Sequence, residues 1–107
     1  MAYLVALALI ATDFTGIWAG TVVTDNDIPM HMTLSQHGDT VRGTFGGDQA
    51  IQYTITRAVI GETTLTVEAQ PGSIFRLDLK LNGEKLVGQV FKDERMVGTV
   101  TLERVRQ

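Results

Sequence analysis

The chain contains no cysteine, and this absence excludes several kinds of site. Without thiols there is no disulfide framework, no thiolate-bound zinc and no cysteine nucleophile. The sequence has only two prolines and one tryptophan, and no lysine or arginine precedes Arg42. With a formal net charge of −3 and no aromatic residues set among basic ones, it lacks the positive surface that binds nucleic acid. We therefore expect no nucleic-acid partner.

Long apolar runs are absent except at the N-terminus, where Met1–Ala11 carries no charged side chain. This stretch is shorter than the roughly 20 residues of a membrane-spanning helix, so no membrane span is expected. Three interpretations stay open. It is part of a signal peptide, with Ala6-Leu7-Ala8 resembling a cleavage site and a secreted or periplasmic location; it packs on its own domain; or it pairs with a neighbouring chain. We therefore separate an apolar segment, residues 1–12, from one domain, residues 13–107.

A helical repeat is also absent, because apolar and polar residues alternate with period two from Phe14 onward. Turn-forming residues separate the alternating runs. The strongest signal is Asn82-Gly83, which tolerates the positive φ that a type I′ turn needs at both central positions. The pattern predicts eight strands, at Phe14–Thr24, Pro29–Gln36, Thr40–Phe45, Ile51–Arg57, Thr63–Ala69, Ser73–Leu81, Lys85–Lys92 and Arg95–Val105. The short connections predict an all-β, antiparallel up-and-down meander that closes into an eight-stranded barrel.

The alternation also assigns side chains to an inner and an outer face. An eight-stranded barrel holds side chains or one small ligand inside. Inward glycines such as Gly20 and Gly43 either leave room for a ligand or permit the strands to coil. Ile51 and Ile55 are expected to point inward with Tyr53, whose hydroxyl would orient a ligand or reach the barrel rim. The residues predicted to line an apolar binding site are Met30, Met32, Phe45, Tyr53, Phe75 and Leu77.

The outer face of the first, seventh and eighth predicted strands carries apolar residues. A closed meander makes the first and last strands neighbours, so these residues would form one patch, and such patches usually mark contacts. We therefore expect a homo-oligomer. Its predicted contacts are Ile17, Val87, Phe91 and Val97 on the outer face, with Tyr3, Leu4 and Leu7 of the N-terminal segment.

Few residues suggest a catalytic or metal site. His31 and His37 lie six positions apart on one strand, which separates them by roughly 20 Å, too far to share a metal ion. The aspartates of Asp25-Asn26-Asp27 lack the further ligand and the glycine of a calcium loop. No serine sits in a nucleophile-elbow context. The sequence therefore predicts no catalytic residue, no metal site and no cofactor.

Gly16-Ile17-Trp18 near the start, with Arg104 near the end, resembles the pattern of calycins, the group of lipocalins, fatty-acid-binding proteins and avidins. Residues 13–20, 34–43 and 81–88 are also similar to small bacterial lipocalin-like domains of uncharacterised function. The resemblance implies that Trp18 lies inward near the closed barrel end and that a basic side chain from the last strand covers it. We expect Arg104 to be this cation, with a stabilisation of roughly 0.5–2 kcal/mol.

Three functions remain open from the sequence. The first is a non-catalytic barrel that binds a small apolar ligand in its interior. The second is an assembly protein that builds oligomers or filaments through its N-terminal segment and outer patch. The third is a barrel enzyme that acts on an apolar substrate. A continuous interior cavity would favour the first function, and a filled interior with contacts between chains would favour the second.

Overall fold

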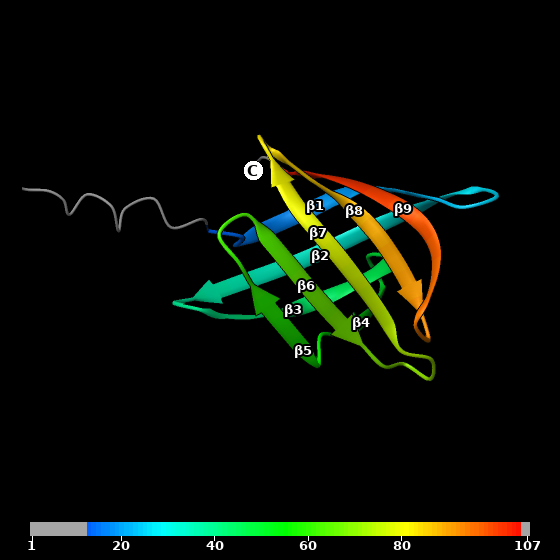
Figure 1. Cartoon of the computed structure of the whole chain (residues 1–107), viewed down its shortest axis with the longest axis horizontal. Coiled ribbons are helices and arrows are strands. Elements are labelled where there is room, and N and C mark those ends of the chain that lie inside the picture. Colours follow the sequence, from blue (N-terminus) through cyan, green and yellow to red (C-terminus); the bar gives the residue numbers. More distant parts are fainter. Residues whose placement is uncertain (1–12, 106–107) are drawn as a thin grey trace, which may run out of the picture.

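The computed structural model describes residues 13–105. These residues form nine antiparallel strands in one sheet and no helix, which confirms the all-β meander (Figure 1). The strands are β1 (Gly16–Val23), β2 (Asp27–His37), β3 (Thr40–Asp48), β4 (Ile51–Thr54), β5 (Arg57–Ile60), β6 (Thr64–Ala69), β7 (Phe75–Asn82), β8 (Lys85–Lys92) and β9 (Arg95–Arg104). Their order in the sheet is β4-β3-β2-β1-β9-β8-β7-β6-β5.

The sheet is a curled half-barrel of nine strands, so the prediction of a closed eight-stranded barrel is wrong. The predicted strand Ile51–Arg57 is divided: β4 pairs with β3, whereas β5 pairs with β6. At the division the Ile55 N–H donates to the Gly43 carbonyl of β3 (2.9 Å), and the Thr56 N–H donates to the Glu68 carbonyl of β6 (2.8 Å). The chain thus changes partner between two adjacent residues, and the pairing of the sheet is interrupted there.

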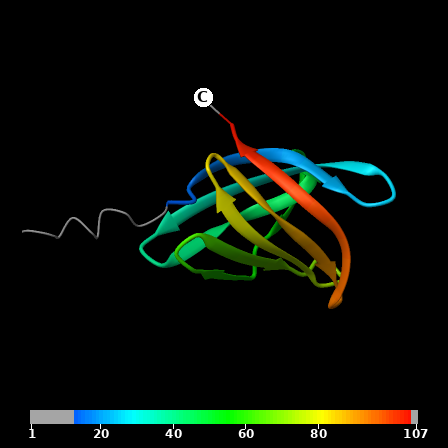
Figure 2. The ribbon, with the colours of Figure 1, turned by 45° about the horizontal axis from the view of Figure 1, so that its top comes forward.

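The first and last strands are neighbours, as the meander predicts. β1 pairs with β9 over six positions, from Trp18 opposite Arg104 to Val23 opposite Thr99. This pairing curls the sheet so that β6, β7 and β8 cross over β1, β2 and β3 in Figure 1. The turned view in Figure 2 shows the two halves of the sheet facing each other.

The core lies between these two halves and consists of inward side chains from most strands. It comprises Phe14, Trp18, Val22, Met30, Met32, Leu34, Val41, Phe45, Leu65, Val67, Ala69, Leu77, Leu79, Leu86, Val90, Val100 and Leu102. A Cβ at Gly20, Gly43 or Gly88 would collide with a carbonyl oxygen of the neighbouring strand. These inward glycines therefore permit strands to approach closely in a coiled sheet, and they do not leave room for a ligand.

The two ends of the half-barrel differ in how well they are covered. At one end Phe14 and Trp18 are fully buried, and the Trp18 Nε1–H donates to the Phe14 carbonyl (3.0 Å). At the other end, which we call the open end, Ile28 is 44% exposed and Tyr53 is 38% exposed. Ile51 and Tyr53, which were predicted to point inward, are exposed at this end, with 58% and 38% of their surface accessible. β4 is the terminal strand of the sheet, so nothing pairs beyond it to cover them.

Candidate functional site

One cavity lies where the chain changes partner, between β3 and β5. We call it the wall slot, a cavity of about 470 Å³. Its lining comes from β3 with the preceding turn and from β4, β5 and the residues that join them. The lining residues are Asp39, Thr40, Val41, Arg42, Gly43, Thr54, Ile55, Thr56, Arg57 and Ala58.

On the side of the wall slot, the backbone pairing of β3 with β4 ends at Gly43. The Gly43 carbonyl points into the slot, because it accepts the Ile55 N–H, and alternation places the peptide groups of Val41 on the same edge. On the other side the Gly61 N–H donates to the Thr64 carbonyl (2.8 Å), so alternation turns the backbone groups of Ala58 and Ile60 away from β6. Within residues 13–105 no ladder joins β3 to β5. The slot therefore lies between two free strand edges.

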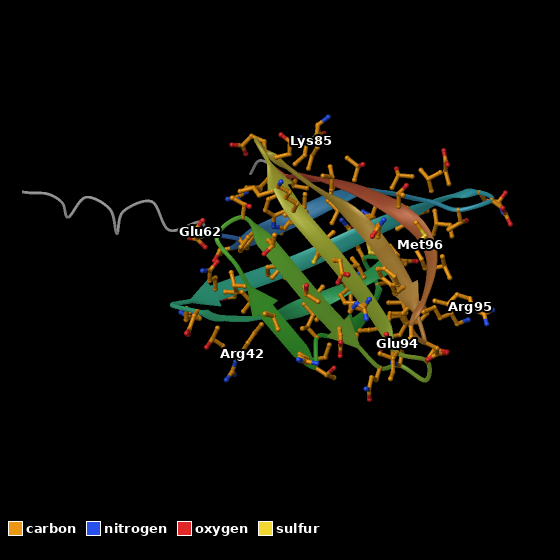
Figure 3. The ribbon with its side chains drawn as sticks, in the orientation of Figure 1. Arg42, Glu62, Lys85, Glu94, Arg95 and Met96 are labelled. Carbon is orange, nitrogen blue, oxygen red and sulfur yellow. The ribbon has the colours of Figure 1, made fainter. Side chains whose placement is uncertain are left out.

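The side chains around the slot differ between its inner and outer sides. Val41 is buried, and Ile55 and Ala58 are partly buried against the core. Arg42 projects outward, away from the ribbon (Figure 3). Arg57 is also exposed, with its Nη1 3.9 Å from a Glu68 carboxylate oxygen. An occupant of the slot would therefore meet apolar groups on one face and two cations on the other.

The predicted ligand residues do not line this cavity. Met30, Met32, Phe45 and Leu77 are core residues, 9% exposed or less, and Phe75 is partly buried beside them. Tyr53 lies at the open end. Neither the wall slot nor the second cavity contains any of these six predicted residues in its lining. These side chains were predicted to form a binding surface, but most of them fill the interior as part of the core.

The second cavity, of about 320 Å³, lies on the outer face of β5, β6 and β7. Arg76 dominates it, because its guanidinium bonds to Asp78 and Glu94 at 3.1 Å each and lies 4.2 Å from the Phe91 ring centroid. The hydrogen bond with Glu94 is the main reason that the pKa of the Arg76 guanidinium is raised. Because Asp78 and Glu94 already pair with the Arg76 guanidinium, this cavity has no unpaired positive charge at Arg76 for a ligand to bind.

The closed end contains the predicted contact between tryptophan and arginine. The Arg104 guanidinium carbon lies 4.5 Å from the Trp18 ring centroid, and its Nη2 donates to the Asp13 carbonyl (3.0 Å). The Thr15 N–H donates to the Asp13 carboxylate (3.0 Å), and the hydrogen bonds from Thr15 lower the pKa of that carboxyl group. These contacts attach the start of the described chain to its end. Trp18 and Arg104 therefore close the end structurally.

The predicted oligomer contacts do not form one open apolar face. Ile17, Val87 and Phe91 are half-buried, and Val97 is 37% exposed. Thr99 and Thr101 of β9 lie between β1 and β8, opposite Val23, Thr21, Gln89 and Val87. Tyr3, Leu4 and Leu7 lie outside the described residues. The outer patch is thus interrupted by hydroxyl groups.

The described residues contain no group of three or more metal-ligating side chains. The His37 ring nitrogen Nε2 lies 3.2 Å from the Ser35 hydroxyl, and the His31 Nδ1 is buried without a partner. Residues 13–105 also contain no helix with the length and apolar character to cross a membrane.

Comparisons with protein-family models, curated proteins and solved structures found no match to this chain. The calycin resemblance therefore stays a prediction from the residues quoted for it. The wall slot was not predicted, since Tyr53, Ile55 and their polar neighbours keep the same alternation across the change of partner. Period two assigns a face to each residue, but it does not say which strand pairs with which.

Proposed function

We propose that this protein is a non-catalytic binding module that accepts an extended, mainly apolar polypeptide strand in the wall slot. The observation that carries this proposal is the pair of facing strand edges that no ladder joins, with the backbone groups of Val41, Ala58 and Ile60 turned toward the slot by strand alternation. An added strand supplies the missing donors and acceptors, and the main-chain hydrogen bonds provide affinity. It shares strand addition with the assembly function predicted from the sequence, but it uses the wall slot instead of the outer patch.

Cα atoms of β3 and β5 lie within 8 Å of each other at several positions, so these two strands must separate before a further strand can enter between them. The free edges extend over about four residues on each side, or about 13 Å. Because β3 and β5 run in opposite directions, an inserted strand pairs antiparallel to one and parallel to the other. Its inward side chains meet Ile55 and Ala58, and its outward side chains lie beside Arg42 and Arg57. The preferred partner alternates apolar residues with polar or acidic ones.

The same edges are protected against unspecific pairing. β5 has only four residues, and arginines flank the slot on both sides. Short edge strands and charged edge residues are the usual defences against aggregation. The slot is therefore selective for a partner that places no cation beside Arg42 or Arg57.

A substitution pair at Ala58 tests the proposal. Ala58→Pro removes an N–H that points into the slot and leaves the hydrogen bonds to β6 in place, whereas Ala58→Val keeps the N–H. A short blocked peptide of alternating threonine and valine is titrated into each variant and followed by amide NMR. We expect saturable shifts around Val41 and Ile60 in the valine variant and much weaker binding in the proline variant. Equal binding by both variants, or no saturable binding, would contradict the proposal.

A second function, binding of a small apolar molecule, has one observation in its favour. At the open end, inward-facing side chains become exposed, with Ile28 on β2 and Tyr53 on β4, while Phe75 on β7 is partly buried. Lys92 lies with its Nζ 6.0 Å from the Phe75 ring centroid, which places a cation beside these apolar groups. A molecule with an apolar body and an acidic group fits this chemistry.

A further inference from the structure

We infer that the outer edge of β4 pairs with the same edge of a second copy of this chain, so that two half-barrels form a symmetric dimer with one continuous sheet. The outer edge of β4 faces away from β3, whereas the wall slot lies between β3 and β5, so the two sites do not coincide. The exposure of this edge, its lack of charge and the order of its side chains support the pairing.

The outer edge of β4 carries backbone groups that are turned away from β3. β4 pairs with β3 at Tyr53, and the Ile55 N–H donates to the Gly43 carbonyl of β3. Alternation therefore directs the N–H and carbonyl groups of Gln52 and Thr54 toward the opposite edge. Among the described residues no ladder forms on that edge, and only β3 runs alongside β4. No neighbouring strand has to move before another strand can pair there.

β4 also lacks the charges that usually protect the edge of a sheet. Its four residues, Ile51 to Thr54, include neither a charged side chain nor proline, whereas β5 at the other end of the sheet begins with Arg57. β4 is as short as β5, which limits the pairing to a few hydrogen bonds. In a symmetric pair, a charge near the axis would lie beside its own copy and repel it. The absence of charge therefore favours self-pairing in particular.

The side chains from Ile51 to Ile55 follow an order that is nearly the same in both directions. With a two-fold axis at Tyr53, antiparallel pairing places Tyr53 opposite Tyr53 of the second copy, and Ile51 opposite the second copy's Ile55. Gln52 and Thr54 then exchange main-chain hydrogen bonds with Thr54 and Gln52 of the second copy. The apolar side chains and the tyrosines share one face, and the polar ones share the other. This strand is thus self-complementary, as an isologous interface requires.

The surroundings of β4 are complementary in charge at its two ends. Asp48 lies opposite Ile51 at the start of β4, and Arg57 follows its end. Antiparallel pairing brings the start of one β4 beside the end of the other, so an acidic residue of one copy approaches a basic residue of the other at both ends. Both residues are exposed, and Arg57 also lies 3.9 Å from Glu68. Such charges therefore favour the antiparallel direction more than they add to affinity.

Single cysteines test the pairing directly, because the chain has no thiol of its own. In the expected register the two copies of Tyr53 have Cα atoms about 4.5 Å apart, within reach of a disulfide, whereas the two copies of Thr54 are about 8 Å apart, beyond it. Under mild oxidation of the full chain, we expect Tyr53→Cys to form a covalent dimer about tenfold faster than Thr54→Cys. Equal rates, or no covalent dimer from either variant, would overturn the inference.

Sedimentation of the full chain at several protein concentrations gives an independent measurement. Gln52→Pro removes an N–H directed at the outer edge, whereas Gln52→Val keeps it; both lose the side-chain bonds to Thr44 and Asp48. We expect the wild type and the valine variant to dimerise as the concentration rises, and the proline variant to associate about tenfold more weakly. Equal association of the two variants would place the contact on another surface, and a wild type that stays monomeric at every concentration would also overturn the inference.

Discussion

Two residues with left-handed backbone conformations connect β8 to β9. Asp93 has φ of 49° and Glu94 has φ of 70°. Glycine or asparagine usually occupies such positions, because a Cβ is disfavoured there. Two hydrogen bonds with Ile74 hold Asp93 in this conformation. The Ile74 N–H donates to the Asp93 carboxylate (2.9 Å), and the Asp93 N–H donates to the Ile74 carbonyl (2.8 Å). Glu94 makes only the ion pair with Arg76, and its side chain is 78% exposed.

Glu94→Gly is therefore expected to stabilise the protein. Glycine relieves about 1 kcal/mol of backbone strain at this φ, and an exposed ion pair usually contributes less than that. The measurement is the free energy of unfolding from urea denaturation. Glu94→Ala serves as the control, because it removes the same ion pair but keeps a Cβ. Equal stability of the two variants would show that strain at this position is negligible.

Asp13 gives a pH dependence whose sign follows from its hydrogen bonds. The bonds from Thr15 lower the pKa of the folded-state carboxyl, so the associated stability is present above its ordinary pKa and is lost as the pH falls through the lower folded value. Asp13→Asn keeps an oxygen that can accept the Thr15 N–H but does not titrate. We expect the stability difference between wild type and variant to shrink below about pH 4, measured by thermal unfolding across pH. A constant difference would exclude Asp13 as the source.

At the level of elements, contacts from β9 to β1 and to the residues before it close one end of the half-barrel. Arg104 covers the Trp18 ring and also holds the Asp13 carbonyl. Arg104→Ala is expected to lower the free energy of unfolding by about 1–3 kcal/mol, since it loses both a cation–π contact and a hydrogen bond. Arg95→Ala, at the exposed start of the same strand, is the matched control. A loss no larger than in the control would contradict a closing role.

The strands up to residue 45 and from residue 64 were located from alternation and turn residues, and Trp18 with Arg104 from parity and the calycin resemblance. β3 continues through Gly46 and Gly47 to Asp48, three residues beyond its predicted end. The division of residues 51–60 into β4 and β5 was not predicted, because Ile55 continues the pattern while its neighbour Thr56 bonds to a different strand. Which strand a residue pairs with depends on how far the whole sheet curls. The wall slot is created by that curling, so local periodicity does not reveal it.

At the scale of the molecule, the exposure of inward side chains at the open end allows the second candidate function to be tested. Ile28 is 44% exposed and Val59, on the outer face of β5, is 52% exposed. Ile28→Asp and Val59→Asp thus change two similarly exposed side chains in different places. If the open end binds apolar anions, Ile28→Asp should weaken the binding of an anilinonaphthalene sulfonate dye by about fivefold, equivalent to about 1 kcal/mol, and Val59→Asp should not. Equal dye binding by both variants would exclude this end.

The bond between Asp13 and Arg104 joins residues that are 91 positions apart. During synthesis, β1 leaves the ribosome before its β9 partner exists, and only the β2 side of its backbone can be satisfied. Trp18 then has a pairing partner on the β2 side only, until almost the entire chain has been translated. Pairing at such long sequence separation folds slowly. One edge of the first strand therefore stays accessible to other chains for a long interval. This exposure ends when β9, including Arg104, pairs with β1.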